Sequence, residues 1–233
     1  MGLMELLLGR KKPEFVERIC LTTERKLAEI VGQVRADRER GVGCVAVTHF
    51  QATHRALLEA FDKDGVKGRS IANSREFPTN VLQLVSKEGS TLVLASDAIP
   101  SAVAQTDSSQ SKHQALGPVT VYLAEHYPCA GRDERVLALD KAWPVRLKFI
   151  CYTALDEPWL MSPGIDRVRD MFHMLGMDKE TAIEPVRYGR AIQLLGRSIR
   201  AEQKRLAQQV PHEQASESCQ EWVRRNLDSR HGR

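Results

Sequence analysis

Short apolar runs alternate with amphipathic segments over residues 23–155 of this sequence. Four runs are bounded by glycine or polar residues and are mostly rich in valine, which predicts buried strands over residues 44–50, 91–95, 119–123 and 147–155. A shorter strand is expected over residues 69–72. Helical spacing of apolar residues and capping signals predict helices over residues 23–40, 53–61, 79–87 and 133–141. Gly41 and Gly65 mark the ends of the first two helices.

This alternation of strands and helices is typical of an α/β domain, in which a mainly parallel sheet lies between helices on both faces. The polar stretch over residues 96–117 interrupts the alternation and is predicted to be a long loop.

From residue 164 onward the pattern is helical only, with helices predicted over residues 165–175, 185–209 and 213–227. The longest of them carries an apolar stripe of Val186, Ile192, Leu195, Ile199 and Leu206. Such a stripe needs a cover, so this helix is expected to fold back on its own sheet, to dimerise or to dock on another protein. The expected organisation is an N-terminal stub (1–18), an α/β domain (19–163) and a helical extension (164–233).

The net charge of +4 lies in the helical extension. Residues 184–233 contain ten Lys or Arg against six Asp or Glu, which accounts for the whole excess. A basic surface favours an acidic partner, an anionic membrane surface or nucleic acid, while a solvated helix face is the simpler interpretation.

The five cysteines are scattered and form no CxxC pair, which is typical of the reducing cytosol, so a cytoplasmic location is expected. No stretch of about 18 apolar residues occurs, so no transmembrane helix is expected. The apolar residues 3–8, followed by Arg10, Lys11 and Lys12, are expected to pack on the protein or to touch a membrane surface.

Motifs for common chemistries are absent from the sequence. There is no GxxxxGK[ST] phosphate loop, no GxSxG elbow and no HExxH pair. His126 with Cys129, and His49 with His54, are too few for a metal site, so structural roles are expected. The carboxylates of Asp156 and Glu157 are adjacent in sequence and diverge, which makes an acid–base pair a poor interpretation. No catalytic, metal-binding or cofactor-binding residue is therefore assigned.

A series of segments from residue 155 onward resembles a continuous stretch of the SecA preprotein translocase ATPase. The segments are LDEPWL (155–160), GIDRV (164–168), MLGMD (174–178), AIEP (182–185) and RAI (190–192). Upstream, residues 22–26, 41–47 and 92–97 are similar to SecA in the same order. The resemblance covers residues 19–204 and implies a RecA-like second nucleotide-binding domain followed by the start of the scaffold helix.

The sequence departs from SecA where that family handles the nucleotide. Ser101 and Ala104 stand where the SecA pattern has an arginine and an aspartate, and Leu137, Leu139 and Ala142 stand where it has arginines. Aliphatic side chains cannot stabilise a transferring phosphoryl group, and losing one such arginine costs about 10³–10⁵ in rate. Arg132 or Lys141 could replace the lost arginines only from a nearby position.

The resemblance and its departures imply a non-catalytic interaction or regulatory module linked to protein translocation. Its implied partners are a SecA-type motor, a translocon, the ribosome or a second copy of the chain. One alternative is a half-motor that binds ATP only together with a phosphate-loop domain on another chain. The other is a helicase remnant that holds nucleic acid through Arg187, Arg190, Arg197, Arg200, Lys204 and Arg205, although this helix lacks interleaved aromatic residues.

Overall fold

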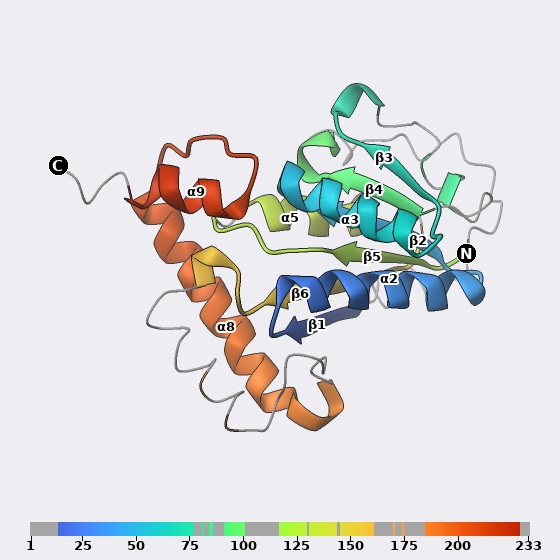
Figure 1. The fold of residues 1–233 in the computed structure, drawn as a ribbon, viewed down its shortest axis with the longest axis horizontal. Coiled ribbons are helices and arrows are strands. Elements are labelled where there is room, and N and C mark those ends of the chain that lie inside the picture. The colour runs from blue at the N-terminus through green and yellow to red at the C-terminus, as the bar shows by residue number, and fades with distance from the viewer. Residues whose placement is uncertain are drawn as a thin grey trace, which may run out of the picture.

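The chain folds around one six-stranded parallel sheet with the strand order β1-β6-β5-β2-β4-β3 (Figure 1). The computed structural model describes residues 14–76, 81, 84–85, 91–100, 117–129, 131–143, 145–160, 170, 174 and 185–228. The strands are β1 (Glu14–Cys20), β2 (Gly43–Thr48), β3 (Gly68–Ile71), β4 (Thr91–Ala95), β5 (Val119–Leu123) and β6 (Leu147–Ala154).

Helices cover both faces of this sheet, as the alternating pattern predicts. The helices of the described residues are α2 (Thr23–Glu39), α3 (Gln51–Lys63), α5 (Arg132–Leu137), α6 (Leu139–Ala142), α8 (Pro185–Gln209) and α9 (Cys219–Asn226), with 3-10 turns at η1 (Ser74–Glu76), η2 (Ser96–Ala98) and η4 (Pro158–Leu160). Helices α2 and α3 pack on one face, and α5 and α6 on the other. The expected α/β class with a helical C-terminal extension is confirmed.

Strand β1 was not predicted from the sequence. It pairs in parallel with β6 from Glu14 opposite Lys148 to Cys20 opposite Ala154, so it is an edge strand of the sheet. Its charged residues mask the apolar pattern, because only its last residues are fully buried. The boundary expected after residue 18 falls inside this strand, so residues 14–18 belong to the sheet rather than to a separate stub.

Two other predicted elements differ from the structure. The helix expected over residues 133–141 is divided into α5 and α6. The helix expected over residues 213–227 begins only at Cys219, where Ser218 accepts a hydrogen bond from the Glu221 backbone N–H as the N-cap. Gly41 and Gly65 follow α2 and α3 with positive φ angles of 73° and 67°, which confirms their predicted role at the helix ends.

Several predictions fall partly or wholly on residues outside those described. These are the apolar segment at residues 3–8, the loop core at 101–116, most of the helix over 79–87 and most of the helix over 165–175. Residues 81, 84, 85, 170 and 174 are helical.

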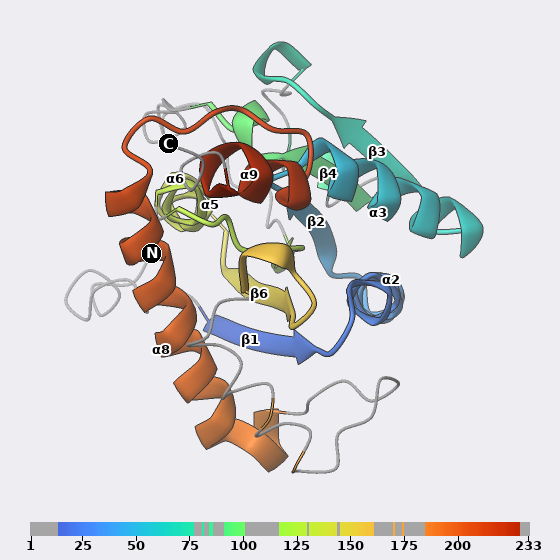
Figure 2. The same ribbon diagram turned by 60° about the vertical axis from the view of Figure 1, so that its left-hand side comes forward.

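The chain itself covers the apolar stripe of α8 from Ile192 to Leu206, and the side chain of Val186 lies outside those described. Leu195, Ile199 and Leu206 are completely buried in a cluster that also contains Ile19 of β1 and Trp222 of α9. In both views α8 runs beside β1 at the end of the sheet to which the strands point, and α9 follows it there (Figures 1 and 2). Of the three arrangements expected for this stripe, the structure shows folding back on the sheet.

Candidate functional site

The carboxyl ends of the parallel strands are the natural place to look for a ligand site. In open α/β sheets, ligands bind in the crevice outside these ends, where the strand order reverses. In this chain β2 lies between β4 and β5, and the helices that follow β2 and β5, α3 and α5, pack on opposite faces of the sheet. The same end is covered by α8, α9 and the segment that joins them (Figure 2).

A buried polar cluster centred on Asp133 lies at this end. The Asp133 carboxylate lies 2.6 Å from His126 Nδ1 and 2.8 Å from His49 Nε2. It also accepts hydrogen bonds from the Tyr127 backbone N–H at 3.0 Å and from the Gln203 amide of α8 at 2.9 Å. The His49 contact is an ion-pair distance without the alignment of a hydrogen bond. Asp133 therefore ties the ends of β2 and β5 to helix α8.

The electrostatics of this cluster favour an ion pair between Asp133 and His126. Burial opposes the charged form of Asp133, but His126 and His49 hold its pKa far below the usual range. Burial alone would lower the pKa of His126, whereas the hydrogen bond to Asp133 and the charges of Asp133, Glu17 and Glu157 raise it above 6.5. The negative charge of Asp133 and the positive charge of His126 therefore compensate each other inside the cluster.

Glu125 performs a second structural task beside this cluster. Its carboxylate accepts hydrogen bonds from the backbone N–H groups of His49 and Phe50, at 2.9 and 3.0 Å, and from the Thr53 hydroxyl at 2.6 Å. Phe50 is the N-cap of α3 and has no capping side chain. Glu125 therefore fixes, from the end of β5, the two residues that lead into α3 and the Thr53 side chain in its first turn.

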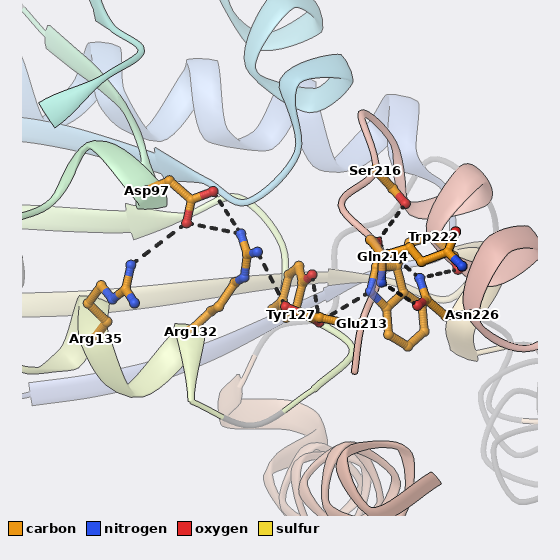
Figure 3. Close-up of polar contacts among 9 residues, drawn as sticks. All are labelled: Asp97, Tyr127, Arg132, Arg135, Glu213, Gln214, Ser216, Trp222 and Asn226. Carbon is orange, nitrogen blue, oxygen red and sulfur yellow. Dashed lines mark hydrogen bonds and ion pairs between the residues drawn. The ribbon is translucent and has the colours of Figure 1, made fainter. Parts of the chain in front are cut away.

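The clearest candidate for anion recognition is Arg132, the first residue of α5 (Figure 3). Its guanidinium binds both carboxylate oxygens of Asp97, at 3.0 and 2.9 Å, and lies 3.3 Å from a Glu213 oxygen. It also lies 4.2 Å from the centre of the Tyr127 ring. Burial opposes the charged form of Arg132, and the neighbouring Tyr127, Asp97 and Glu213 raise its pKa. The charge of this arginine is therefore already balanced within the chain.

The C-terminal residues 210–228, which we call the cap, close this end of the sheet. Within the cap, the Asn226 side chain bonds the Gln214 backbone N–H at 2.7 Å and the Gln214 and Trp222 carbonyl oxygens at 3.2 and 3.0 Å. The Ala52 backbone N–H of α3 donates to the Glu217 carbonyl at 2.9 Å. The cap is thus a folded part of the domain.

Leu137, Leu139 and Ala142, the residues at the arginine positions of the SecA pattern, lie in α5 and α6. Leu139 is buried, and Leu137 and Ala142 are partly buried and pack against the same apolar cluster. Ser101 and Ala104 lie outside the described residues. Of the two residues that could replace these arginines, Arg132 forms ion pairs with Asp97 and Glu213, and Lys141 is exposed on α6.

The structure gives single, structural roles to the two adjacent acids of the LDEPWL segment. Asp156 accepts hydrogen bonds from the Thr23 backbone N–H and hydroxyl, at 3.0 and 2.8 Å, at the start of α2. Glu157 forms a buried ion pair with Lys26 at 2.8 Å and accepts a hydrogen bond from the Trp159 indole at 3.1 Å. The two carboxylates therefore point to different partners.

The basic residues of α8 do not form a single free surface. Arg200 lies 3.6 Å from Glu17, and Arg205 pairs with Glu202 on its own helix. Arg197 and Lys204 are exposed. The side chains of Arg187 and Arg190 lie outside those described.

A cavity of about 460 Å³ lies at the opposite, amino end of the strands. Its lining includes Arg18, Asp37 and Arg146. Asp37 is bound by Tyr122 and Arg40, and these contacts outweigh burial and lower its pKa. This cavity is remote from the carboxyl-end cluster.

The described residues hold neither a metal-binding cluster nor a membrane-spanning helix. They contain no group of three or more His, Cys, Asp or Glu placed to hold a metal ion. In the same part of the chain, no helix is long and apolar enough to cross a membrane.

The polar residues of this end were not assigned from the sequence. The sequence predicts structural roles for His49 and His126, but it does not predict the roles of Asp133, Glu213 and Gln203. Their position could have indicated this site, because His49 comes directly after β2, and Glu125 and His126 come just after β5, at the carboxyl ends of the strands. Glu213 has no such signal, because the cap reaches this end only through the tertiary fold.

No protein-family model matches the chain, and no curated protein matches it. One similar solved structure is the C-terminal domain of a possible DNA helicase from Lactobacillus plantarum WCFS1, with 16% identity, a TM-score of 0.36 and coverage of 62% of this chain and 74% of that chain. Another is the C-terminal part of the Fun30 ATPase domain, with 9% identity, a TM-score of 0.40 and coverage of 76% of this chain and 54% of that chain. This chain therefore spans about half the length of the Fun30 chain. The likeness to these helicase- and ATPase-type domains concerns the fold alone.

Proposed function

We propose that this protein is a non-catalytic interaction or regulatory module, a degenerate relative of the second nucleotide-binding domain of SecA that neither binds nor hydrolyses ATP on its own. The observation that carries the proposal is the occupation of the carboxyl end of the sheet by the chain's own cap. Arg132, a cation well placed for a phosphate at this end, is engaged by Asp97 and Glu213.

The packing of α5 and α6 supports the same proposal. Catalysis of phosphoryl transfer depends on cationic groups aimed at the phosphate oxygens. Leu137, Leu139 and Ala142 instead contribute to the apolar cluster beneath the sheet. Replacing them with arginine would bury charges, so the loss of these cations is built into the core.

A protein partner is the natural ligand of such a module. By analogy with SecA, the partner would be a SecA-type motor, a translocon component or a second copy of the chain, in the cytoplasm. The stripe of α8 is used internally, so the partner would contact other surfaces, such as the exposed side of α8 that carries Leu194 at 45% exposure.

Calorimetric titration of the full chain with ATP and magnesium tests the proposal. We expect no heat of binding in the micromolar range and no phosphate release, whereas a phosphate-loop ATPase under the same conditions gives both. Micromolar binding of ATP by the isolated chain would contradict the proposal.

A half-motor is the second candidate, and the exposure of Arg135 favours it. This residue is 42% exposed in its side chain and meets Asp97 only at 3.7 Å, so it retains a charge that a neighbouring chain could use. The titration repeated with a phosphate-loop partner decides between the two. Binding that appears only with both chains and is lost in Arg135→Gln would establish the half-motor.

A further inference from the structure

Three donors converge on the carboxylate of Glu213. The Tyr127 hydroxyl donates to it at 2.9 Å, the Arg132 guanidinium at 3.3 Å and the Trp222 indole N–H at 3.4 Å (Figure 3). The donors come from three separate segments: the chain after β5, the start of α5, and α9. A cation and two neutral hydrogen-bond donors that meet at one carboxylate can bind the oxygen atoms of an anion.

The charges around this point leave it short of negative charge once Glu213 is removed. Arg132 and Arg135 are the cations, and both also contact Asp97. The Asp97 side chain is 62% exposed, so part of its charge is screened by water. Arg132 would then face the vacated position with only the exposed Asp97 as its direct counter-charge, and Asp97 is shared with Arg135.

We propose that Tyr127, Arg132 and Trp222 form an oxyanion site, which Glu213 occupies in cis and which accepts a carboxylate or phosphate ligand in its place. The inference goes beyond the proposed function, because it assigns a binding site and a ligand class and requires no reaction.

The position of Glu213 makes exchange feasible. It lies on residues 211–218, which have no regular secondary structure, and its side chain is 31% exposed. Trp222 is completely buried and is anchored through the Asn226 contacts to the rest of the cap. Asn226 also holds the backbone of Gln214, so exchange requires only that the Glu213 side chain rotate out of the site while the indole donor stays.

Chemical rescue of Glu213→Ala tests the site. The truncated side chain leaves space for a small anion, so we expect the melting temperature of this variant to fall and then to rise with added acetate or phosphate. Sodium chloride at equal ionic strength should not reproduce the rise. Glu217→Ala is the matched control, because this glutamate is also in the cap but its side chain pairs with Arg55.

The two anions distinguish the source of the ligand. A steeper response to acetate assigns the site to carboxylates such as an acidic peptide side chain, and a steeper response to phosphate assigns it to phosphorylated ligands. Adding Tyr127→Phe to Glu213→Ala should weaken either response, since one donor is removed. A response equal to that of Glu217→Ala for both anions would overturn the site.

A second measurement covers the case in which Glu213→Ala does not fold. Glu213→Gln keeps the shape and removes the charge, and calorimetry with inorganic phosphate and with acetate should show at least one of them binding about tenfold more tightly than to the wild type. Equal affinity of both anions for the two proteins would refute the inference. ATP binding by the wild type would refute the proposed function and leave this site standing, so the two failures are distinct.

Discussion

Lys26 and Glu157 show how individual residues hold this sheet end together. Lys26 is 1% exposed, and its ammonium group lies 2.8 Å from Glu157. Glu157 also accepts hydrogen bonds from the Ala154 backbone N–H and the Trp159 indole, at 3.1 Å each. Burial opposes the charged form of Lys26, but Glu157 and Glu125 raise its pKa. Both charges are therefore retained in the interior.

Lys26→Met should strongly destabilise the protein. The variant leaves Glu157 buried without its counter-charge, and breaking such a pair from one side costs about 3–5 kcal/mol. Arg35→Met is the control on the same helix, because Arg35 and Asp64 are about half exposed at 3.7 Å and such pairs contribute only ~0–1 kcal/mol. Urea unfolding measures both free energies. Equal losses in the two variants would show that the buried pair contributes little.

His126 makes the stability of the folded protein depend on pH through the cluster around Asp133. The charged groups that face it are Asp133 of α5, Glu17 of β1 and Glu157, with Arg200 of α8 paired to Glu17. Because its pKa in the folded state is raised above 6.5, its protonated form contributes stability. That contribution is fully present below pH 6.5 and is lost as the pH rises through the raised pKa.

His126→Gln should remove this loss, since glutamine does not titrate. Denaturant unfolding from below pH 6.5 into the alkaline range should show the wild type losing stability relative to His126→Gln as the pH rises. His212→Gln, which replaces an exposed histidine of the cap, should follow the wild type. A constant difference between wild type and His126→Gln across the range would contradict the assignment.

At the scale of elements, the buried strands were predictable and the edge strand was not. Residues 91–95 and 119–123 form strands β4 and β5 with the predicted bounds, because central strands of a parallel sheet are apolar on both faces. In β1, Glu17 packs toward α8 and Phe15 is 42% exposed, so its pattern reflects neighbours far along the chain.

The candidate site was less predictable than the fold. Its residues come from positions 97, 127, 132, 213 and 222, and no spacing rule links them. The sequence does predict that nucleotide-binding groups are absent. It cannot predict how the cap reaches this end, because the part of the helix expected over residues 213–227 that precedes Cys219 has no regular secondary structure and is tied by side chains.

Gly196 fixes how closely α8 approaches β1. A Cβ atom at this position would lie 3.3 Å from the Glu17 carboxylate, whereas a Cβ atom at Gly32 in α2 would meet no atom within 4 Å. Both glycines are inside helices, where alanine is favoured by about 0.5–1 kcal/mol. The two sites therefore differ in packing rather than in helix propensity.

Gly32→Ala should raise the free energy of unfolding by about 0.5–1 kcal/mol. Gly196→Ala should raise it less or lower it, because Glu17 is held between His126 and Arg200 and has little room to move. Thermal unfolding followed by circular dichroism compares the two variants directly. An equal gain at both positions would show that α8 is not seated tightly on the edge strand.

For the whole molecule, the decisive feature is an apolar cluster that joins the sheet to the C-terminal extension. Ile19, Phe50 and Leu155 come from the sheet and its loops, and Leu195 and Trp222 come from α8 and α9. The Tyr127 ring stacks on Phe50 with centroids 5.5 Å apart and meets Trp222 edge-on at 6.2 Å. Sheet and extension share this cluster, so we expect them to unfold together in one cooperative transition.

Trp222→Ala tests that coupling. Truncating a buried tryptophan costs about 3–5 kcal/mol, and here the loss should lower the stability of the whole chain. Circular dichroism and the fluorescence of Trp143 and Trp159, which lie in different clusters, should report the same lowered midpoint in denaturant. Leu194→Ala, at a side chain 45% exposed on α8, should change it little. Two separate transitions, with the sheet unfolding at the wild-type midpoint, would show that the extension folds as a unit of its own.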